Sequence, residues 1–175
     1  MIEDRSDKWE KEYLSELPNY QKFEQTLRVL IETLLKKEGL SVQVSSRTKS
    51  PASFREKIER KFQEGKSYDN PLNDITDIVG IRIIAYYLND IDKIDYIIKK
   101  EFNIDEKNSL DKSALLGIDQ FGYKSVHYIV SISEPRLELT EWIEFGNYKA
   151  EIQIRTILQH AWAEIDHEIR YKKDE

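Results

Sequence analysis

Four polar segments of this 175-residue chain hold side chains whose types and spacing could do chemistry. The first is basic, with Arg47 and Lys49 just before a helix that Pro51 is expected to open. Helical spacing puts further polar residues on one face of that helix: Ser53, Lys57, Arg60 and Lys61. Lysine meets phosphate as a point charge and arginine as a planar fork, so the array suits a polyphosphate. The alternative is an ordinary solvated helix face, because 34% of the residues are charged.

The second segment joins a carboxylate to an apolar strand. Asp77 leads directly into the run 78–87, which is typical of a strand covered on both faces. A carboxylate at the mouth of such a strand is held rigidly and could bind a metal, although aspartate is also common in caps and turns. Arg82 lies inside the run, where a guanidinium is unfavourable unless it reaches a partner or a ligand.

The third segment runs from Phe121 to Tyr128. Period two puts Tyr123 and His127 on the same side of a strand. An aromatic ring there could stack a base, and the imidazole could meet phosphate. Ordinary core or surface positions would explain this pair as well.

The fourth segment is a strand with one polar face. Glu151, Gln153 and Arg155 alternate with isoleucines. An acid, an amide and a guanidinium on one face are what a nucleotide pocket requires, although a solvent-facing strand would show the same pattern. Mg²⁺ is usually held by one or two carboxylates together with phosphates and water, so Asp77 and Glu151 are expected to hold Mg²⁺.

A zinc site on the last helix is not expected. His160, Glu164 and His167 share a helical face, but the sequence lacks the His-Glu-x-x-His arrangement. We expect His160 to serve packing or substrate contacts.

Hydrophobic periodicity predicts the elements that must position these residues. Charged residues 3–17 and the apolar stripe after Pro18 predict two N-terminal helices within 1–40. The whole chain, 1–175, is expected to be one domain with its catalytic core at 41–171, an α+β fold whose mixed sheet is flanked by helices. The expected strands are 41–45, 78–87, 124–133, 137–144 and 148–155, and the later helices are 51–62, 90–100 and 156–171.

Composition narrows the class of protein. The net charge of −6 disfavours a large non-specific nucleic-acid surface, and the absence of cysteine excludes thiolate sites. No apolar run could span a bilayer and no signal peptide is visible, so we expect a cytoplasmic protein without a membrane partner. The sequence also lacks a P-loop, a Gly-x-Gly-x-x-Gly fingerprint and a Gly-x-Ser-x-Gly elbow.

Taken in order, the four segments resemble the synthetase domain of the RelA/SpoT family, the (p)ppGpp synthetases. The resemblance covers about residues 20 to 171 and rests on 46–53, 74–82, 122–127 and 151–156, with 160–164. It implies a nucleotidyltransferase-like fold. It also implies transfer of the β,γ-diphosphate of ATP to the 3′-hydroxyl of GDP or GTP, with release of AMP.

The resemblance also implies residue roles. On the donor side, Arg47 and Arg82 would sandwich the adenine, and the ATP phosphates would be bound by Lys49, Ser53 and Lys57. Asp77 and Glu151 would hold Mg²⁺, and Glu151 would help to deprotonate the acceptor hydroxyl. On the acceptor side, Tyr123 would stack on the guanine, with the remaining contacts from Lys124, His127, Gln153, Arg155 and His160.

Two other functions stay open from sequence. A toxin-type relative would place the diphosphate on the 3′ end of tRNA or on adenosine nucleotides and could have an antitoxin partner. A tRNA substrate requires a basic patch, for which Lys36 and Lys37 with Lys8 and Lys11 are the candidates. A non-catalytic nucleotide sensor is disfavoured because both expected metal ligands are present.

Three departures from the family bear on these expectations. Segment 115–121 lacks the basic, Pro- and Asn-containing stretch of housekeeping small synthetases, which leaves the acceptor open. There is no room for a hydrolase domain, so synthesis without degradation is expected. The chain stops soon after Tyr171, where tetramer-forming relatives continue.

Overall fold

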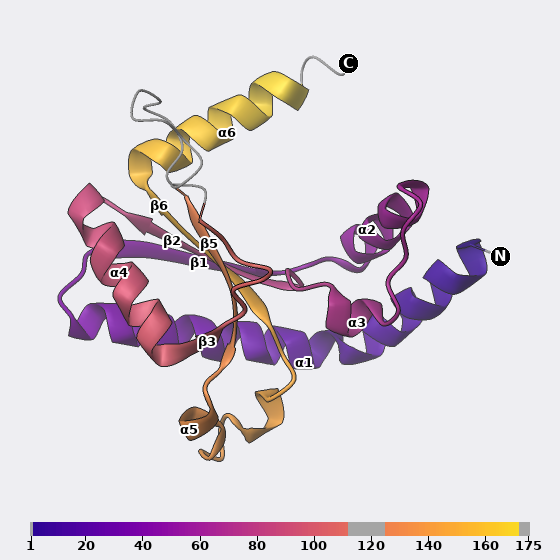
Figure 1. Ribbon diagram of the computed structural model, residues 1–175, viewed down its shortest axis with the longest axis horizontal. Coiled ribbons are helices and arrows are strands. Elements are labelled where there is room, and N and C mark those ends of the chain that lie inside the picture. The colour runs from indigo at the N-terminus through magenta and orange to yellow at the C-terminus, as the bar shows by residue number, and fades with distance from the viewer. Residues whose placement is uncertain (1, 112–124, 172–175) are drawn as a thin grey trace.

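The computed structural model describes residues 2–111 and 125–171, in which a long helix lies along a central sheet (Figure 1). This helix, α1 (Ile2–Lys37), extends along most of the long axis of the molecule. One stripe of it faces the core, and its fully buried members are Tyr13, Phe23, Leu27, Ile31 and Leu35. The spacing of these residues is that of an amphipathic helix on a sheet.

Pro18 does not divide this helix. The prediction of two N-terminal helices is wrong, because α1 is continuous through Pro18. A proline within a helix removes one backbone hydrogen bond and crowds the carbonyl four residues earlier. Tyr13 and Tyr20 flank it, are both buried, and have ring centroids 5.7 Å apart. Packing on both sides of the proline therefore outweighs its local penalty.

The strands form one mixed sheet in the order β1–β2–β6–β5–β3, with β4 paired to β5. Strands β2 and β6 are parallel and the other pairs are antiparallel. Helices flank the sheet, so the predicted α+β class is confirmed. The strands are β1 (Val42–Thr48), β2 (Val79–Ala85), β3 (Phe102–Ile104), β4 (Leu110–Asp111), β5 (Val126–Ile132) and β6 (Ala150–Thr156). The remaining helices are α2 (Pro51–Gln63), α3 (Pro71–Asp74), α4 (Leu88–Glu101), α5 (Glu134–Leu137) and α6 (Ile157–Tyr171).

The two faces of the sheet differ in character. Helices α1 and α4 pack against the strands and against each other, and they cover the face that carries Ile81, Ile83 and Ile152. The opposite face carries polar side chains at the alternate positions of β1, β2 and β6. Strand β2 was expected to be covered on both faces, but Gly80 and Arg82 are only half-buried. The polar face is thus available for a site.

The structure corrects two further predictions. Residues 137–144 do not form a strand; α5 and a short 3₁₀ turn, Ile143–Phe145, occupy this region. Trp142 and Phe145, three residues apart, are buried and pack edge to face, which is a helical spacing and not a strand spacing. Strand β1 extends beyond the predicted residue 45 to Thr48, and this extension brings Arg47 into the sheet.

Among the described residues, no helix is both long and apolar enough to cross a bilayer.

Candidate active site

The polar face of the sheet holds a hollow where β1, β2 and β6 lie side by side. Period two alternation directs every second side chain of each strand into it. The parallel register pairs Gly80 with Glu151 and Arg82 with Gln153, so polar residues of both strands meet at one level. The hollow is lined by Ser45, Ser46, Arg47, Asp77, Gly80, Ile81, Arg82, Glu151 and Gln153.

Asp77 is held between two lysines. Its carboxylate lies 3.2 Å from the ammonium group of Lys49 and accepts from that of Lys57 at 2.7 Å. Burial raises the pKa of Asp77, but the two ammonium groups outweigh it, and the pKa lies below the ordinary value of 3.8. Asp77 is therefore ionised at neutral pH, in the centre of a cationic pair.

The local sequence explains how Lys57 reaches this position. Helix α2 begins at Pro51, as predicted, and Ser50 caps it by accepting from the backbone N–H of Ser53 at 3.2 Å. One helical turn after Ser53, Lys57 faces Asp77. The hydroxyl of Ser53 is exposed and accepts from Ser50 at 3.0 Å.

Glu151 is held by donors on both carboxylate oxygens. Nδ1 of His127 lies 3.0 Å from one oxygen, and the amide nitrogen of Gln153 donates to the other at 3.0 Å. Burial raises the pKa of Glu151, but His127 and Gln153 outweigh it, so the pKa lies below 4.5. Arg155 is 9% exposed and donates to the Gln153 carbonyl oxygen at 2.7 Å. Because arginine only donates, this contact fixes which way the Gln153 amide points.

Ser125 extends this group and was missed by the sequence reasoning. Its hydroxyl lies 3.0 Å from Nε2 of His127. When Nδ1–H of a neutral imidazole donates to Glu151, Nε2 is the acceptor, so Ser125 donates to it. The signal was available, since Ser125 precedes His127 by two residues and shares its side of the strand.

Arg82 finds the partner that its place in an apolar strand requires. Its guanidinium lies 3.5 Å from the carboxylate of Glu164 on α6, and His160 lies 3.6 Å from the same oxygen. Arg47 lies on the neighbouring strand, where its side chain passes 3.7 Å from the place that a Cβ at Gly80 would take. Both arginines line the hollow.

Not every predicted site residue is part of this cluster. Lys61 places its ammonium 4.9 Å from the ring centroid of Tyr68, and Arg60 is exposed on α2. Tyr123 and Lys124 lie outside the described residues, as does the side chain of His167. Within 2–111 and 125–171, no group of three or more His, Cys, Asp or Glu could by itself hold a metal ion.

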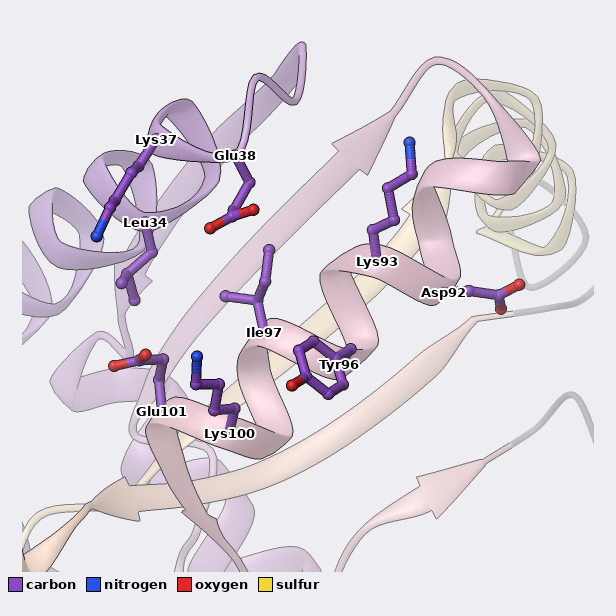
Figure 2. Close-up of a pocket in the computed structure, with 9 residues that line it drawn as sticks. All are labelled: Leu34, Lys37, Glu38, Asp92, Lys93, Tyr96, Ile97, Lys100 and Glu101. Carbon is purple, nitrogen blue, oxygen red and sulfur yellow. The ribbon is translucent and has the colours of Figure 1, made fainter.

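Figure 2 shows a second hollow, between the C-terminal end of α1 and one face of α4. Leu34 and Ile97 face each other across it, and Glu38, Glu101 and Lys100 reach into the space between the helices. Its lining mixes charges of both signs and contains none of the residues predicted to bind nucleotide or metal. The candidate site is therefore the hollow on the open face of the sheet.

The sequence of this chain is similar to those of known proteins. Residues 46–175 match the family described as "Region found in RelA / SpoT proteins". The chain is 35% identical over 127 residues to the GTP pyrophosphokinase YwaC of Bacillus subtilis, a match that covers 73% of this chain and 57% of that relative. The chain thus spans somewhat more than half the length of this relative.

Solved structures share the fold over nearly the whole chain. A GTP pyrophosphokinase family protein from Streptococcus pneumoniae gives a TM-score of 0.69 at 25% identity, over 92% of this chain and 77% of its own. Small alarmone synthetase 1 from Bacillus subtilis, bound to its product pppGpp, gives a TM-score of 0.67 at 25% identity. The match covers 94% of this chain and 82% of that structure. The predicted fold is confirmed, and this chain belongs to the RelA/SpoT family.

Proposed function

We propose that this chain is an ATP-dependent pyrophosphokinase that transfers the β,γ-diphosphate of ATP to the 3′-hydroxyl of GDP or GTP and releases AMP. One observation carries the proposal: Asp77 and Glu151, both held ionised, line one hollow together with Arg47 and Arg82. The names of its relatives, GTP pyrophosphokinase and small alarmone synthetase, support the same activity.

The donor side suits a nucleoside triphosphate. Arg47 and Arg82 would stack on the two faces of the adenine, because guanidinium planes stack well on flat rings. The ammonium groups of Lys49 and Lys57, which pair with Asp77 in the structure, would neutralise the phosphates. Ser53 at the start of α2 adds a hydroxyl on the same side.

The acceptor side suits the removal of a proton from a hydroxyl. Glu151 would accept the proton of the 3′-hydroxyl as its oxygen bonds to the β-phosphorus, and the bond from that phosphorus to the α-phosphate oxygen would break to release AMP. His127 and Gln153 hold the carboxylate in place, and Arg155 orients Gln153. His160 meets Glu164 at the α6 end of this side.

The carboxylate oxygens of Asp77 and Glu151 also suit Mg²⁺. Asp77 and Glu151 are ionised oxygen ligands in one hollow, and Mg²⁺ prefers one or two carboxylates completed by phosphates and water. These two residues would hold the ion, which would neutralise charge on the diphosphate as it is transferred.

The four lysines that were candidates for a tRNA-binding patch do not lie together on α1. Lys8 and Lys11 lie near the N-terminal end of α1, and Lys36 and Lys37 lie at its C-terminal end. At 1.5 Å per residue, Lys11 and Lys36 are roughly 38 Å apart. The relatives are named GTP pyrophosphokinase, so a guanosine nucleotide is the acceptor that we propose, in the cytoplasm where such nucleotides are available.

Labelled ATP tests this function. ATP carrying label in the γ-phosphate is incubated with the protein and Mg²⁺, and GDP, GTP, ATP and tRNA are offered separately. We expect label on GDP or GTP and release of AMP. Label on tRNA alone would contradict the proposal that a guanosine nucleotide is the acceptor. Label on none of the four would contradict the proposed pyrophosphokinase activity.

A further inference from the structure

The N-terminal half of α1 is joined to the donor side of the site by buried contacts. Tyr13 is fully buried, and its hydroxyl donates to the backbone carbonyl of Lys49 at 2.6 Å. Its ring stacks on Phe54 of α2, with centroids 4.3 Å apart and an interplanar angle of 18°. Tyr13 therefore contacts the backbone of Lys49 and also α2, the helix that contains Lys57.

The backbone of Lys49 is held from two directions. Its N–H donates to the carbonyl of Ile78 at 2.8 Å, next to Asp77, while its carbonyl accepts from Tyr13. Ser50 follows immediately and caps α2. A rotation of the peptide unit between Lys49 and Ser50 would therefore displace the lysine and the first turn of α2 together.

Arg55 makes a second contact between α2 and α1. It lies two residues from both Ser53 and Lys57, which at roughly 100° per residue is nearly the opposite side of the helix. Its guanidinium lies 2.5 Å from Asp7 and 3.1 Å from Glu10, both on α1. A half-exposed ion pair adds little stability. Its place on the back of α2 nevertheless fixes the rotation of that helix, and with it the direction of Lys57.

We propose that Tyr13 is a positioning residue for the diphosphate donor, and that Arg55 assists it. Both act through Lys49 and α2 and not by touching ATP. The inference rests on the proposed function, because it takes the Lys49 and Lys57 side as the subsite for the ATP phosphates. Both contacts use α1, which precedes the family region 46–175, so a segment outside that region completes the donor subsite.

Substitution Tyr13→Phe tests this in the full chain, with Tyr20→Phe as the matched control. Tyr20 is also buried on α1, and its hydroxyl also donates to a backbone carbonyl, that of Leu72 at 3.2 Å. Each variant keeps its ring and loses one buried hydrogen bond. We expect Tyr13→Phe to raise the KM for ATP about three- to tenfold, the value of one such bond, and to leave the KM for the acceptor unchanged. Tyr20→Phe should change neither KM.

Thermal unfolding of both variants separates positioning from stability. Equal loss of melting temperature with a KM change in Tyr13→Phe alone supports positioning. An unchanged KM for ATP in Tyr13→Phe, or equal changes in both variants and for both substrates, overturns it. A second pair, Arg55→Gln against the half-buried Arg28→Gln, should show the same contrast, since within the described residues the ion pair of Arg28 is with Glu32 of the same helix, at 3.3 Å.

Direct binding separates this inference from the proposed function. The affinity of each variant for a non-hydrolysable ATP analogue with Mg²⁺ is measured by calorimetry. If the wild type transfers no diphosphate but binds the analogue, weaker binding by Tyr13→Phe alone still supports the positioning role. If the wild type is active and all variants bind the analogue equally, only the positioning role fails. A wild type that binds no ATP contradicts both.

Discussion

The two carboxylates of the site are kept charged by different neighbours. Lys49 and Lys57 do this for Asp77, and His127 with Gln153 does it for Glu151. Charged lysines beside Asp77 make the donor side locally cationic although the whole chain carries a net charge of −6. The local arrangement and not the total charge therefore decides which ligand this face attracts.

Removing either carboxylate charge should abolish transfer while the fold persists. Asp77→Asn and Glu151→Gln keep the size of each side chain and are expected to lower kcat/KM at least about 100-fold, as the loss of one preorganised charge does. Asp92→Asn, in the hollow between α1 and α4, is the control and should keep full activity. Full activity in either site variant would contradict the assigned roles.

Tyr13 should also make the fold sensitive to alkali. Burial raises the pKa of Tyr13 from 10.0 to about 12. Below pH 10 its contribution to stability is complete, and it is lost as the pH rises from 10 through about 12, because the unfolded chain releases the proton first. Burial also raises the pKa of Tyr20, which acts in the same direction. Urea unfolding at pH 8 to 11 should therefore show a smaller loss of free energy of unfolding for Tyr13→Phe than for the wild type; an equal loss contradicts the prediction.

At the scale of elements, α1 does more than cover the sheet. Glu24 accepts hydrogen bonds from Ser46 and from Thr48, in the second case at 3.4 Å, so α1 also holds the end of β1 that leads to Lys49. The same helix reaches the turn after β1 through Tyr13 and α2 through Arg55. The three elements of the donor side, namely β1, the turn after it and α2, are therefore all held in place by contacts with α1.

Pro18 is a locally unfavourable residue within α1. Pro18→Ala restores a backbone N–H and relieves the crowding of the carbonyl of Leu14. We expect it to raise the free energy of unfolding by about 1–2 kcal/mol, since the gain within the helix exceeds the entropy that proline removes from the unfolded chain. Chemical denaturation measures this, and a destabilised variant would show that Pro18 is needed in α1.

At the scale of the whole molecule, the sheet separates packing from chemistry. Its covered face is mainly apolar, with Ser46 and Thr48 of β1 bonded there to Glu24 of α1, while its open face carries the site. Ile152 lies on the covered face between Glu151 and Gln153 on the open one. A change at such a position should alter stability more than substrate binding.

Ile152→Ala tests this separation. Deleting a fully buried isoleucine side chain is expected to lower the free energy of unfolding by about 2–5 kcal/mol. Ile143→Ala, at a side chain that is 68% exposed, is the control and should change it by less than about 1 kcal/mol. At a temperature where Ile152→Ala is still folded, both KM values should be close to those of the wild type. A large and selective change in the KM for ATP would contradict the separation of the two faces.

The features that could be predicted before folding are those that depend on local pattern. Apolar periodicity predicted α2, α6, β2 and β6, and alternation placed Glu151, Gln153 and Arg155 on one face, where the hydrogen bonds between them now confirm it. The ordered motifs identified the family and the fold. These features depend on neighbours within a few residues, which is the range that a sequence pattern can describe.

The remaining features depend on contacts between distant segments and appear only in the folded chain. The tertiary structure carried α1 through Pro18, turned 137–144 into helical turns, and left one face of β2 open, because packing against distant segments outweighs local preference. It also joined Asp77 to Lys49 and Lys57 and aimed Tyr13 at the carbonyl of Lys49, 36 residues away. Contacts over such separations have no fixed spacing in a sequence, so the residues that position the site are visible only once the chain is folded.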